Sequence, residues 1–295
     1  MKILVTGIGG PAGRNVSLLL LERGHTVIGA DKRPVQVRGV ACYPLPPARD
    51  PAFLTALAHL AAKVGAELLI PTVQEELPFV AAHQAALGLP IIIAPYAAVN
   101  RADDKLLTAR TLAAAGVPVP SFARPLELHG PDDVTVRIGW PCLSKPRVGR
   151  GGRGIAIYDG PEQWPAIAAL GDEMIIHEFA PGVEYAPNLY LRRGGGEAVV
   201  VVLEKTALRE GRTGNAAGVR RVCAPDVGAV ALAAARALGL SGPVDVDVRR
   251  RADGTPVVLE VNARFGANIA HAPEILEAIP ALNRLPVFEC ASCLF

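Results

Sequence analysis

The sequence predicts an α/β protein with two parts of different character. Over the first hundred residues, short apolar segments alternate with Ala-rich helical segments in the order β-α-β-α-β, which is typical of a parallel sheet with helices on both faces. Later in the chain, the residue pattern predicts two β-hairpins with glycine in their turns. A length of 295 residues, 51% of them hydrophobic, is enough for about two domains with buried cores.

The composition argues against several classes of protein. The net charge is only +2 and no long basic run occurs, so we expect no nucleic-acid partner. Mean hydropathy is +0.30, but the chain lacks the uninterrupted run of about 18 apolar residues that a membrane span needs, and its first residues lack a signal-peptide layout. The five cysteines are odd in number and mostly scattered, which favours a reducing, cytoplasmic compartment. Cys290 and Cys293 have the spacing of half a zinc site, but no second pair exists.

The first domain is predicted to be Rossmann-like and to span residues 1–98. Strands are expected at residues 2–6, 26–30, 68–70 and 91–94, because each is a short apolar run that ends at a glycine, an aspartate or a proline. The segments between these runs carry apolar residues at helical spacing or are rich in alanine. This order places the strands in one parallel sheet.

A glycine-rich turn follows the first strand, with glycine at positions 7, 10 and 13 and with Asp31 at the end of the second strand. This pattern matches a dinucleotide-binding turn and its ribose-binding acid, because glycine lets backbone amides approach a pyrophosphate. The alternative is a tight strand-to-helix turn without a ligand. We favour this alternative, because the chain contains no Tyr-x-x-x-Lys pair for proton transfer and because later segments indicate another nucleotide site.

Two lysines and a glycine-rich loop form the next informative segment. Lys105 follows two aspartates at the start of a predicted helix, and Lys145 lies on a short strand. The run Arg-Val-Gly-Arg-Gly-Gly-Arg-Gly follows at positions 147–154. Glycine allows backbone amides to approach an anion and the cations balance its charge, so the loop suits a polyphosphate. It is not a Walker A loop, since Gly-Lys-Ser/Thr is absent, and a solvated flexible loop is the alternative.

A second predicted hairpin, at residues 244–264, carries oxygen-bearing side chains on one face. Side chains alternate along a strand, so Asp245 and Asp247 share a face, as do Glu260, Asn262 and Arg264. If the Asp-Gly turn pairs the strands in register, the oxygen atoms converge beside a guanidinium. Hard oxygen ligands of this kind are what Mg²⁺ prefers. A salt-bridged, exposed sheet face is the alternative, but the intervening valine and leucine residues indicate burial.

Together with a strand that runs through residues 177–180 toward Glu184, these segments resemble the ATP-grasp superfamily. Within it, they are most similar to the carbamoyl-phosphate-synthase-like branch of carboxylate–amine ligases. The resemblance covers almost the whole chain. It implies a Rossmann-like pre-ATP-grasp domain at residues 1–98 and an ATP-grasp domain of two α+β subdomains at residues 99–295. A lid subdomain would span about residues 119–183.

The resemblance also implies a role for each matching residue. Phosphates would be bound by Lys105 and Lys145 under a mobile loop that includes Arg147, Gly151, Gly152 and Gly154. The adenine hinge would consist of His177, Glu178, Phe179 and Ala180, and Glu184 would hold the ribose. Mg²⁺, or Mn²⁺ in its place, would be carried by Asp247, Glu260 and Asn262. The transferred phosphoryl group would be steadied by the catalytic residues Arg264 and Lys145.

The implied activity is the ATP-dependent activation of a carboxylate as an acyl phosphate, which is then joined to an amine with release of ADP and phosphate. The partners would be a small-molecule acid and amine, and a homodimer is left open. Some residues depart from the family pattern. His177 replaces a residue that is often acidic or polar, and Asp245 stands where related peptide ligases can carry a phosphate-binding arginine. The charge of that arginine could come from any of Arg209, Arg212, Arg220 and Arg221.

Two alternatives of other classes stay open. One is an NAD(P)-dependent oxidoreductase or epimerase that uses the glycine-rich turn at residues 7–13 and Asp31. The other is an ATP-binding protein that keeps the fold without turnover. The first predicts NAD(P) binding, and the second predicts ATP binding without release of phosphate.

Overall fold

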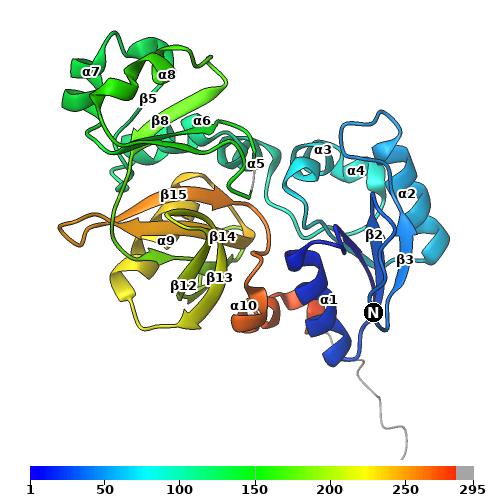
Figure 1. The fold of residues 1–295 in the computed structure, drawn as a ribbon. Helices are drawn as coiled ribbons and strands as arrows, with labels where there is room; N and C mark the ends of the chain where they lie inside the picture. Colours follow the sequence, from blue (N-terminus) through cyan, green and yellow to red (C-terminus); the bar gives the residue numbers. More distant parts are fainter. Residues whose placement is uncertain (150, 284–295) are drawn as a thin grey trace, which may run out of the picture.

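The computed structural model describes residues 1–149 and 151–283, so Cys290 and Cys293 lie outside the described residues (Figure 1). Its first seventy residues form a four-stranded parallel sheet in the order β3-β2-β1-β4. The strands are β1 (Lys2–Thr6), β2 (Thr26–Asp31), β3 (Ala41–Pro44) and β4 (Leu68–Ile70). The α-helices within residues 1–90 are α1 (Pro11–Glu22), α2 (Phe53–Val64), α3 (Leu77–Ala82) and α4 (Gln84–Leu87).

The strand predicted at residues 91–94 is not formed. Ile91 makes a single parallel bridge to Leu69 beside β4. Prolines at positions 90 and 95 flank this segment, and proline has no backbone donor with which to extend a ladder. The chain enters helix α5 (Tyr96–Asp103) directly after Pro95, and helix α6 (Lys105–Ala114) follows. Asp104 caps α6, because its carboxylate accepts hydrogen bonds from the backbone N–H groups of Leu106 and Leu107.

A small antiparallel sheet with two helices forms the region between residues 122 and 178, drawn in green in Figure 1. The strand order is β5-β8-β6-β7, and Lys145 on β6 pairs with Ile175 on β8. The strands are β5 (Phe122–Ala123), β6 (Cys142–Pro146), β7 (Ala156–Tyr158) and β8 (Met174–Glu178). The helices are α7 (Pro131–Arg137) and α8 (Trp164–Ala168).

A seven-stranded sheet occupies the rest of the chain, in the order β11-β10-β14-β9-β12-β13 with β15 paired to β14. Its long central hairpin consists of β14 (Gly242–Arg250) and β15 (Pro256–Asn262). The other strands are β9 (Glu184–Tyr185), β10 (Asn188–Leu191), β11 (Ala198–Val201), β12 (Leu203–Glu210) and β13 (Thr213–Arg221). The helices are α9 (Pro225–Ala237) and α10 (Glu274–Glu277). None of the helices in the described part of the chain is long and apolar enough to cross a membrane.

The hydrophobic cores group these sheets into two bodies. The N-terminal and C-terminal sheets together are named the platform, and the sheet at residues 122–178 is named the lid after its predicted role. One apolar cluster joins Leu4 and Leu69 of the N-terminal sheet to Val246 of the C-terminal sheet. A second cluster joins Ile3 to Phe265 in the same way. The lid sheet has a core of its own, which includes Cys142 and Ile176. Figure 1 shows this lid above β14 and β15, with α6 between them. The interface between lid and platform is therefore the place where polar groups of both can meet.

The glycine-rich turn after β1 is packed against its own surroundings. The backbone N–H of Gly9 donates to Asp31 at 2.9 Å, so this carboxylate holds the turn. A Cβ added at Gly13 would lie 2.3 Å from the carbonyl oxygen of Gly7, and one added at Gly7 would lie 2.3 Å from the side chain of Val73. Gly13 is thus required by the close approach of α1 to the end of β1, and Gly7 by its contact with Val73, which supports the interpretation as a structural turn.

Gly13→Ala should lower the free energy of unfolding by roughly 1–3 kcal/mol, because the added methyl group overlaps backbone atoms that cannot move independently. Gly130→Ala is the matched control, since a Cβ there meets nothing within 4 Å and its φ is extended. Urea unfolding of both variants beside the parent chain measures the difference. Equal stability of the two variants would show that the turn has room for a side chain.

Candidate active site

The face of the β14–β15 hairpin that lies beneath the lid carries the predicted oxygen ligands. Asp245 pairs with Asn262, and Asp247 pairs directly with Glu260. The alternation of the strand sends the intervening valines, among them Val246, into the core on the opposite face. Asp245 and Asn262 are buried, whereas the side chains of Asp247 and Glu260 are 24% and 23% exposed. The structure therefore brings the predicted acids together, with the outer pair accessible.

Two predicted lysines reach this face from different elements. Lys105, the first residue of α6, lies with its Nζ 3.3 Å from Glu260 and donates to the carbonyl oxygen of Gly149 at 2.8 Å. Lys145, on the lid strand β6, donates to the carbonyl oxygen of Leu259 at 2.8 Å. Both ammonium groups are buried. The lid, α6 and the platform thus meet through these two cations.

A third lysine, which the sequence analysis did not identify, completes the set. Lys205 on β12 places its Nζ 2.6 Å from both Glu184 and Asp247, and its side chain is only 5% exposed. The surrounding run, Leu-Glu-Lys-Thr-Ala-Leu-Arg-Glu, has no clear alternation of polar and apolar residues, so its sequence gives no signal of which face is buried. Its role becomes visible only from the pairing of β12 with β9, on which Glu184 lies.

The environments of two of these lysines differ. Burial lowers the pKa of Lys145 to about 8, and the charge of Lys105 adds to this while Glu260 opposes it. Burial also disfavours the ammonium form of Lys205, but the adjacent charges of Asp247 and Glu184 outweigh burial and raise its pKa. Lys205 is therefore held as a cation by the protein itself. An anion bound beside Lys145 would stabilise its ammonium form.

The predicted hinge begins at the end of β8 with a buried histidine. The register of β6 and β8 puts His177 opposite Leu143, on the face that also carries Lys145. His177 Nδ1 lies 2.9 Å from the carbonyl oxygen of Glu178, so this nitrogen carries the proton. Burial, together with the charge of Lys145, holds the pKa of His177 well below its usual range. Its Nε2 is then a buried acceptor, and it has no hydrogen-bond partner among the described residues.

The remaining hinge residues are fixed by arginines. Glu178 forms a two-pronged ion pair with Arg251, with both contacts at 2.8 Å. The ring of Phe179 lies beneath two guanidinium groups, 4.6 Å from that of Arg212 and 4.7 Å from that of Arg249. Ala180 is buried next to this ring. The hinge is thus a well-packed segment between lid and platform.

The glycine-rich loop is described except at position 150, which lies outside the described residues. Gly151, Gly152 and Gly154 all adopt positive φ angles, which favour glycine. The guanidinium of Arg147 is engaged in two ion pairs, with Asp104 at 2.6 Å and with Asp172 at 3.6 Å. It therefore links the lid to the cap of α6, and its predicted contact with phosphate stays a prediction.

Arginines on the platform are divided between the site and the surface. Arg264 donates to the side chain of Asn262 at 3.2 Å and to the carbonyl oxygen of Phe265 at 2.7 Å, which places it beside the acid face. Of the four arginines left open by the sequence, Arg212 is the one that contacts the hinge. The others contact the carbonyl of Ala216 (Arg209), Glu204 (Arg220) and Glu274 (Arg221).

The donor set on the hairpin fits a divalent cation that arrives with anionic ligands of its own. No cluster of three or more His, Cys, Asp or Glu side chains with the arrangement of a metal site occurs within residues 1–149 and 151–283. The predicted set instead combines the carboxylates of Asp247 and Glu260 with the amide of Asn262, and oxygen donors of this kind suit Mg²⁺ when phosphates and water complete the shell. Each of these carboxylates already has a lysine within 3.3 Å.

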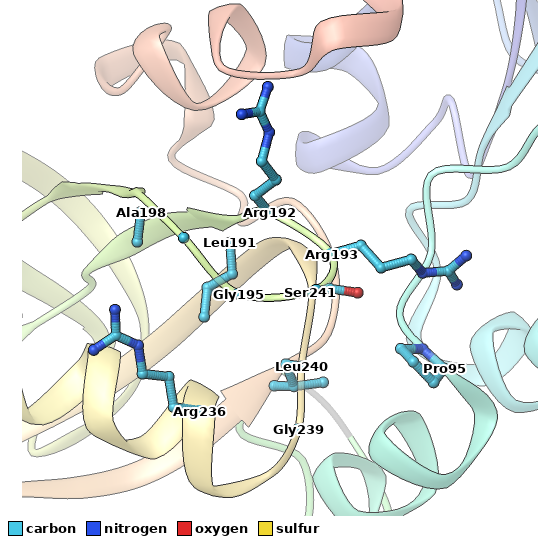
Figure 2. A pocket seen from close by; sticks show the side chains of 12 residues that line it. Pro95, Leu191, Arg192, Arg193, Gly195, Ala198, Arg236, Gly239, Leu240 and Ser241 are labelled. Atoms are coloured by element: carbon cyan, nitrogen blue, oxygen red, sulfur yellow. The ribbon is translucent and has the colours of Figure 1, made fainter.

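A separate pocket of about 290 Å³ opens between the β10–β11 hairpin and the end of α9. Figure 2 shows that Arg192, Arg193 and Arg236 extend from it in three different directions. Ser241, which lines the pocket, lies just before β14 begins at Gly242, whereas Asp247 lies five residues into the strand. It is therefore not part of the acid face, and its arginines do not converge on one point.

Lys205→Met should lower the free energy of unfolding by roughly 3–5 kcal/mol, because it leaves two poorly exposed carboxylates without the cation they share. Arg220→Met is the matched control on the neighbouring strand, since its pair with Glu204 is exposed and contributes about 1 kcal/mol or less. Urea unfolding at neutral pH measures both. A loss for Lys205→Met no larger than that for Arg220→Met would contradict the role of Lys205 as a buried bridge.

The sequence of this chain matches a protein-family model and several known proteins. The family model described as "ATP-grasp domain" matches residues 102–268, which is more than half of the chain. A carbamoyl phosphate synthase large chain from Beutenbergia cavernae is 39% identical over 83 residues, which cover 28% of this chain and 8% of that protein. A D-alanine–D-alanine ligase from Cupriavidus taiwanensis is 28% identical over 216 residues, which cover 61% of this chain and 60% of that protein. The chain thus spans less than two thirds of both relatives.

The fold is also shared with solved structures. An L-amino acid ligase from Bacillus licheniformis superposes with a TM-score of 0.68 at 20% identity, covering 92% of this chain and 69% of that chain. Identity at this level shows a common mixed α/β fold and nothing more specific. The family model, which matches more than half of the chain, carries the assignment further. The chain belongs to the ATP-grasp family.

Proposed function

We propose that this protein is an ATP-dependent ligase that activates a carboxylate as an acyl phosphate and joins it to an amine, with release of ADP and phosphate. The observation that carries the proposal is the meeting of three buried lysines with the acid face of the hairpin. Lys105, Lys145 and Lys205 come from α6, the lid and the platform. Cations from three elements around a pair of carboxylates suit a polyphosphate and a divalent cation better than any neutral ligand.

The nucleotide would lie between lid and platform. The Nε2 atom of His177 is a buried acceptor on the cleft face of β8, so it can receive a hydrogen bond from the exocyclic amine of adenine. Glu184 would accept hydrogen bonds from the ribose. The ammonium groups of Lys105 and Lys145 now bond to the carbonyl oxygens of Gly149 and Leu259. Phosphate oxygens would replace these neutral acceptors with charged ones, which form stronger hydrogen bonds with an ammonium group.

A divalent cation would be held by Asp247, Glu260 and Asn262, and Mn²⁺ would satisfy the same oxygen donors as Mg²⁺. When bound, it would supply positive charge that neutralises the phosphates. Arg264 would be directed at the reacting groups from its place beside Asn262. The loop at residues 147–154 would cover the phosphates with its glycine backbone.

The reaction then needs positioning and charge neutralisation more than a protein nucleophile. A carboxylate does not react with an amine at neutral pH, because its oxygen is a poor leaving group. Attack of the carboxylate oxygen on the γ-phosphorus of ATP creates an acyl phosphate and releases ADP. The amine nitrogen then attacks the acyl carbon, and phosphate leaves. Lys145 and Arg264 would stabilise the charge as it moves, and the closed loop would exclude water that hydrolyses the intermediate.

We also propose a division of the chain into domains. Residues 1–98 would be the Rossmann-like domain and residues 99–295 the ATP-grasp domain, with the lid at about 119–183. The substrates would be small molecules, namely an acid and an amine. A cytoplasmic location is proposed because Cys42, Cys142 and Cys223 are free thiols. A homodimer is a further proposal without a specific contact to support it.

A screen of ADP release should find turnover with at least one pair of carboxylic acid and amine, in the presence of Mg²⁺. Hydroxylamine should trap the activated acid as a hydroxamate, since it competes with the amine for the acyl carbon. Glu260→Gln should abolish both signals, because it removes a charge that would hold the cation but preserves shape. Glu204→Gln, a change outside the cleft, is the matched control and should retain turnover.

The nucleotide product separates the proposal from its rivals. Chromatography should show ADP and phosphate. Accumulation of AMP and pyrophosphate would overturn the acyl-phosphate mechanism, even if an amide formed. Binding of ATP without turnover for any acid–amine pair would favour the ATP-binding protein without catalysis. Binding of NAD(P) in place of ATP would favour the oxidoreductase or epimerase.

A further inference from the structure

We propose that Arg249 is a positioning residue that sets how strongly this protein recognises the ribose hydroxyl groups of its nucleotide. The inference rests on the proposed function, because it assumes that Glu184 faces the ribose. Arg249 lies on β14, two residues after Asp247, and its side chain is 11% exposed. It is directly opposite Glu184 in the pairing of β14 with β9. The register therefore fixes the two residues as cross-strand neighbours.

The guanidinium of Arg249 has four partners in the segments around the hinge. Its Nη1 lies 3.5 Å from Glu184 and donates to the carbonyl oxygen of Arg212 at 2.8 Å. Its Nε donates to the carbonyl oxygen of Gly182 at 3.0 Å, and its plane lies 4.7 Å from the ring centre of Phe179. A planar fork with fixed donor directions can satisfy all of these at once, which an ammonium group cannot.

Glu184 is held in one orientation by cations on both of its oxygens. Lys205 is 2.6 Å from Oε1, and Arg249 is on the side of Oε2. The terminal torsion of a glutamate is otherwise broad, so a carboxylate held from one side can rotate away from a given direction. Ribose hydroxyl groups need acceptors that point at them before binding, because orienting a loose side chain reduces affinity. Arg249 therefore acts on the ribose through Glu184.

The same arginine fixes the hinge against the platform. Phe179 is covered by the guanidinium groups of Arg249 and Arg212, and the backbone N–H of Gly182 donates to the carbonyl oxygen of Arg250 at 2.8 Å. These contacts set the path of residues 179–184, which joins the adenine side of the cleft to the ribose side. The distance between the two recognition points thus depends on the Arg249 side chain.

The next residue in the strand provides a matched control. Arg250 points to the other side of β14, where it pairs with Asp226 at 2.7 Å and donates to the carbonyl oxygen of Gly254 at 2.8 Å. Its guanidinium lies 5.3 Å from the ring centre of Tyr185. Arg250 thus has an ion pair, a carbonyl and an aromatic ring as partners, like Arg249, but its side chain has no contact with Glu184 or Phe179 among the described residues.

The test compares the affinities of two nucleotides, so it needs neither of the unidentified substrates. Equilibrium binding of ATP and of 2′,3′-dideoxy-ATP, both with Mg²⁺, is measured by calorimetry. Hydrogen bonds to a carboxylate should make the parent chain bind ATP about tenfold or more tightly than the dideoxy nucleotide. Arg249→Met should reduce this ratio to about two or less. Loss of the positive charge weakens both nucleotides alike, so it cancels in the ratio.

Arg249→Lys keeps the positive charge but lacks the planar guanidinium, so it should also lower the ratio of the two nucleotide affinities. This variant replaces Arg249→Met in the test if the methionine variant does not fold. Arg250→Met should leave the ratio unchanged within about twofold, even where its thermal stability falls further than that of the Arg249 variants. An unchanged ratio in folded Arg249 variants would overturn the positioning role. If the parent chain binds ATP and the dideoxy nucleotide equally well, Glu184 does not contact the ribose hydroxyl groups. If the parent chain binds no ATP, the proposed function itself is contradicted.

Discussion

The site depends first on the register between β14 and β15. Pairing of Asp247 with Glu260 and of Asp245 with Asn262 puts four oxygen-bearing side chains on one face, while valines enter the core on the other. A slip by one residue would exchange the two faces, burying carboxylates in the core. The aliphatic core and the polar site therefore enforce the same register, and the lysines from α6, β6 and β12 can meet the acids only when it is kept.

Charged groups at the boundary of lid and platform form ion pairs and hydrogen bonds with one another, whereas the Nε2 atom of His177 has no hydrogen-bond partner among the described residues. Lys205 bridges two carboxylates, Lys105 lies between Glu260 and a loop carbonyl, and Lys145 bonds to the backbone of β15. Under the proposed function, phosphate oxygens would replace the neutral carbonyl acceptors of Lys105 and Lys145. Since the lid has a core separate from the platform, the contacts that we propose to change with nucleotide lie along their shared boundary.

Much of this arrangement could be predicted from the sequence, and the exceptions have physical causes. The two strands of the hairpin and the turn at Asp253-Gly254 are predictable from the sequence. The register shift between Asp247 and Val248, which pairs Asp247 with Glu260 where the register of the turn would pair it with Leu259, is not. The resemblance to the ATP-grasp superfamily assigns Lys105 and Lys145 to phosphate, and the structure brings them to Glu260 and to the backbone of Leu259. Lys205 and Arg249 were missed, since their importance comes from strand pairs, β12 with β9 and β14 with β9, that join residues far apart in sequence. The pairing of Arg147 with Asp104 and Asp172 was not foreseen for the same reason.

The central claim, that this face binds a nucleotide together with a divalent cation, is tested most directly by thermal unfolding with ATP and Mg²⁺, with ATP alone and with NAD. A ligand that binds only the folded chain stabilises it by about 2.7 kcal/mol at a hundredfold excess over its dissociation constant. We expect the largest rise in unfolding temperature with ATP and Mg²⁺ together, a smaller rise with ATP alone and none with NAD. A rise with NAD and none with ATP and Mg²⁺ would contradict the claim.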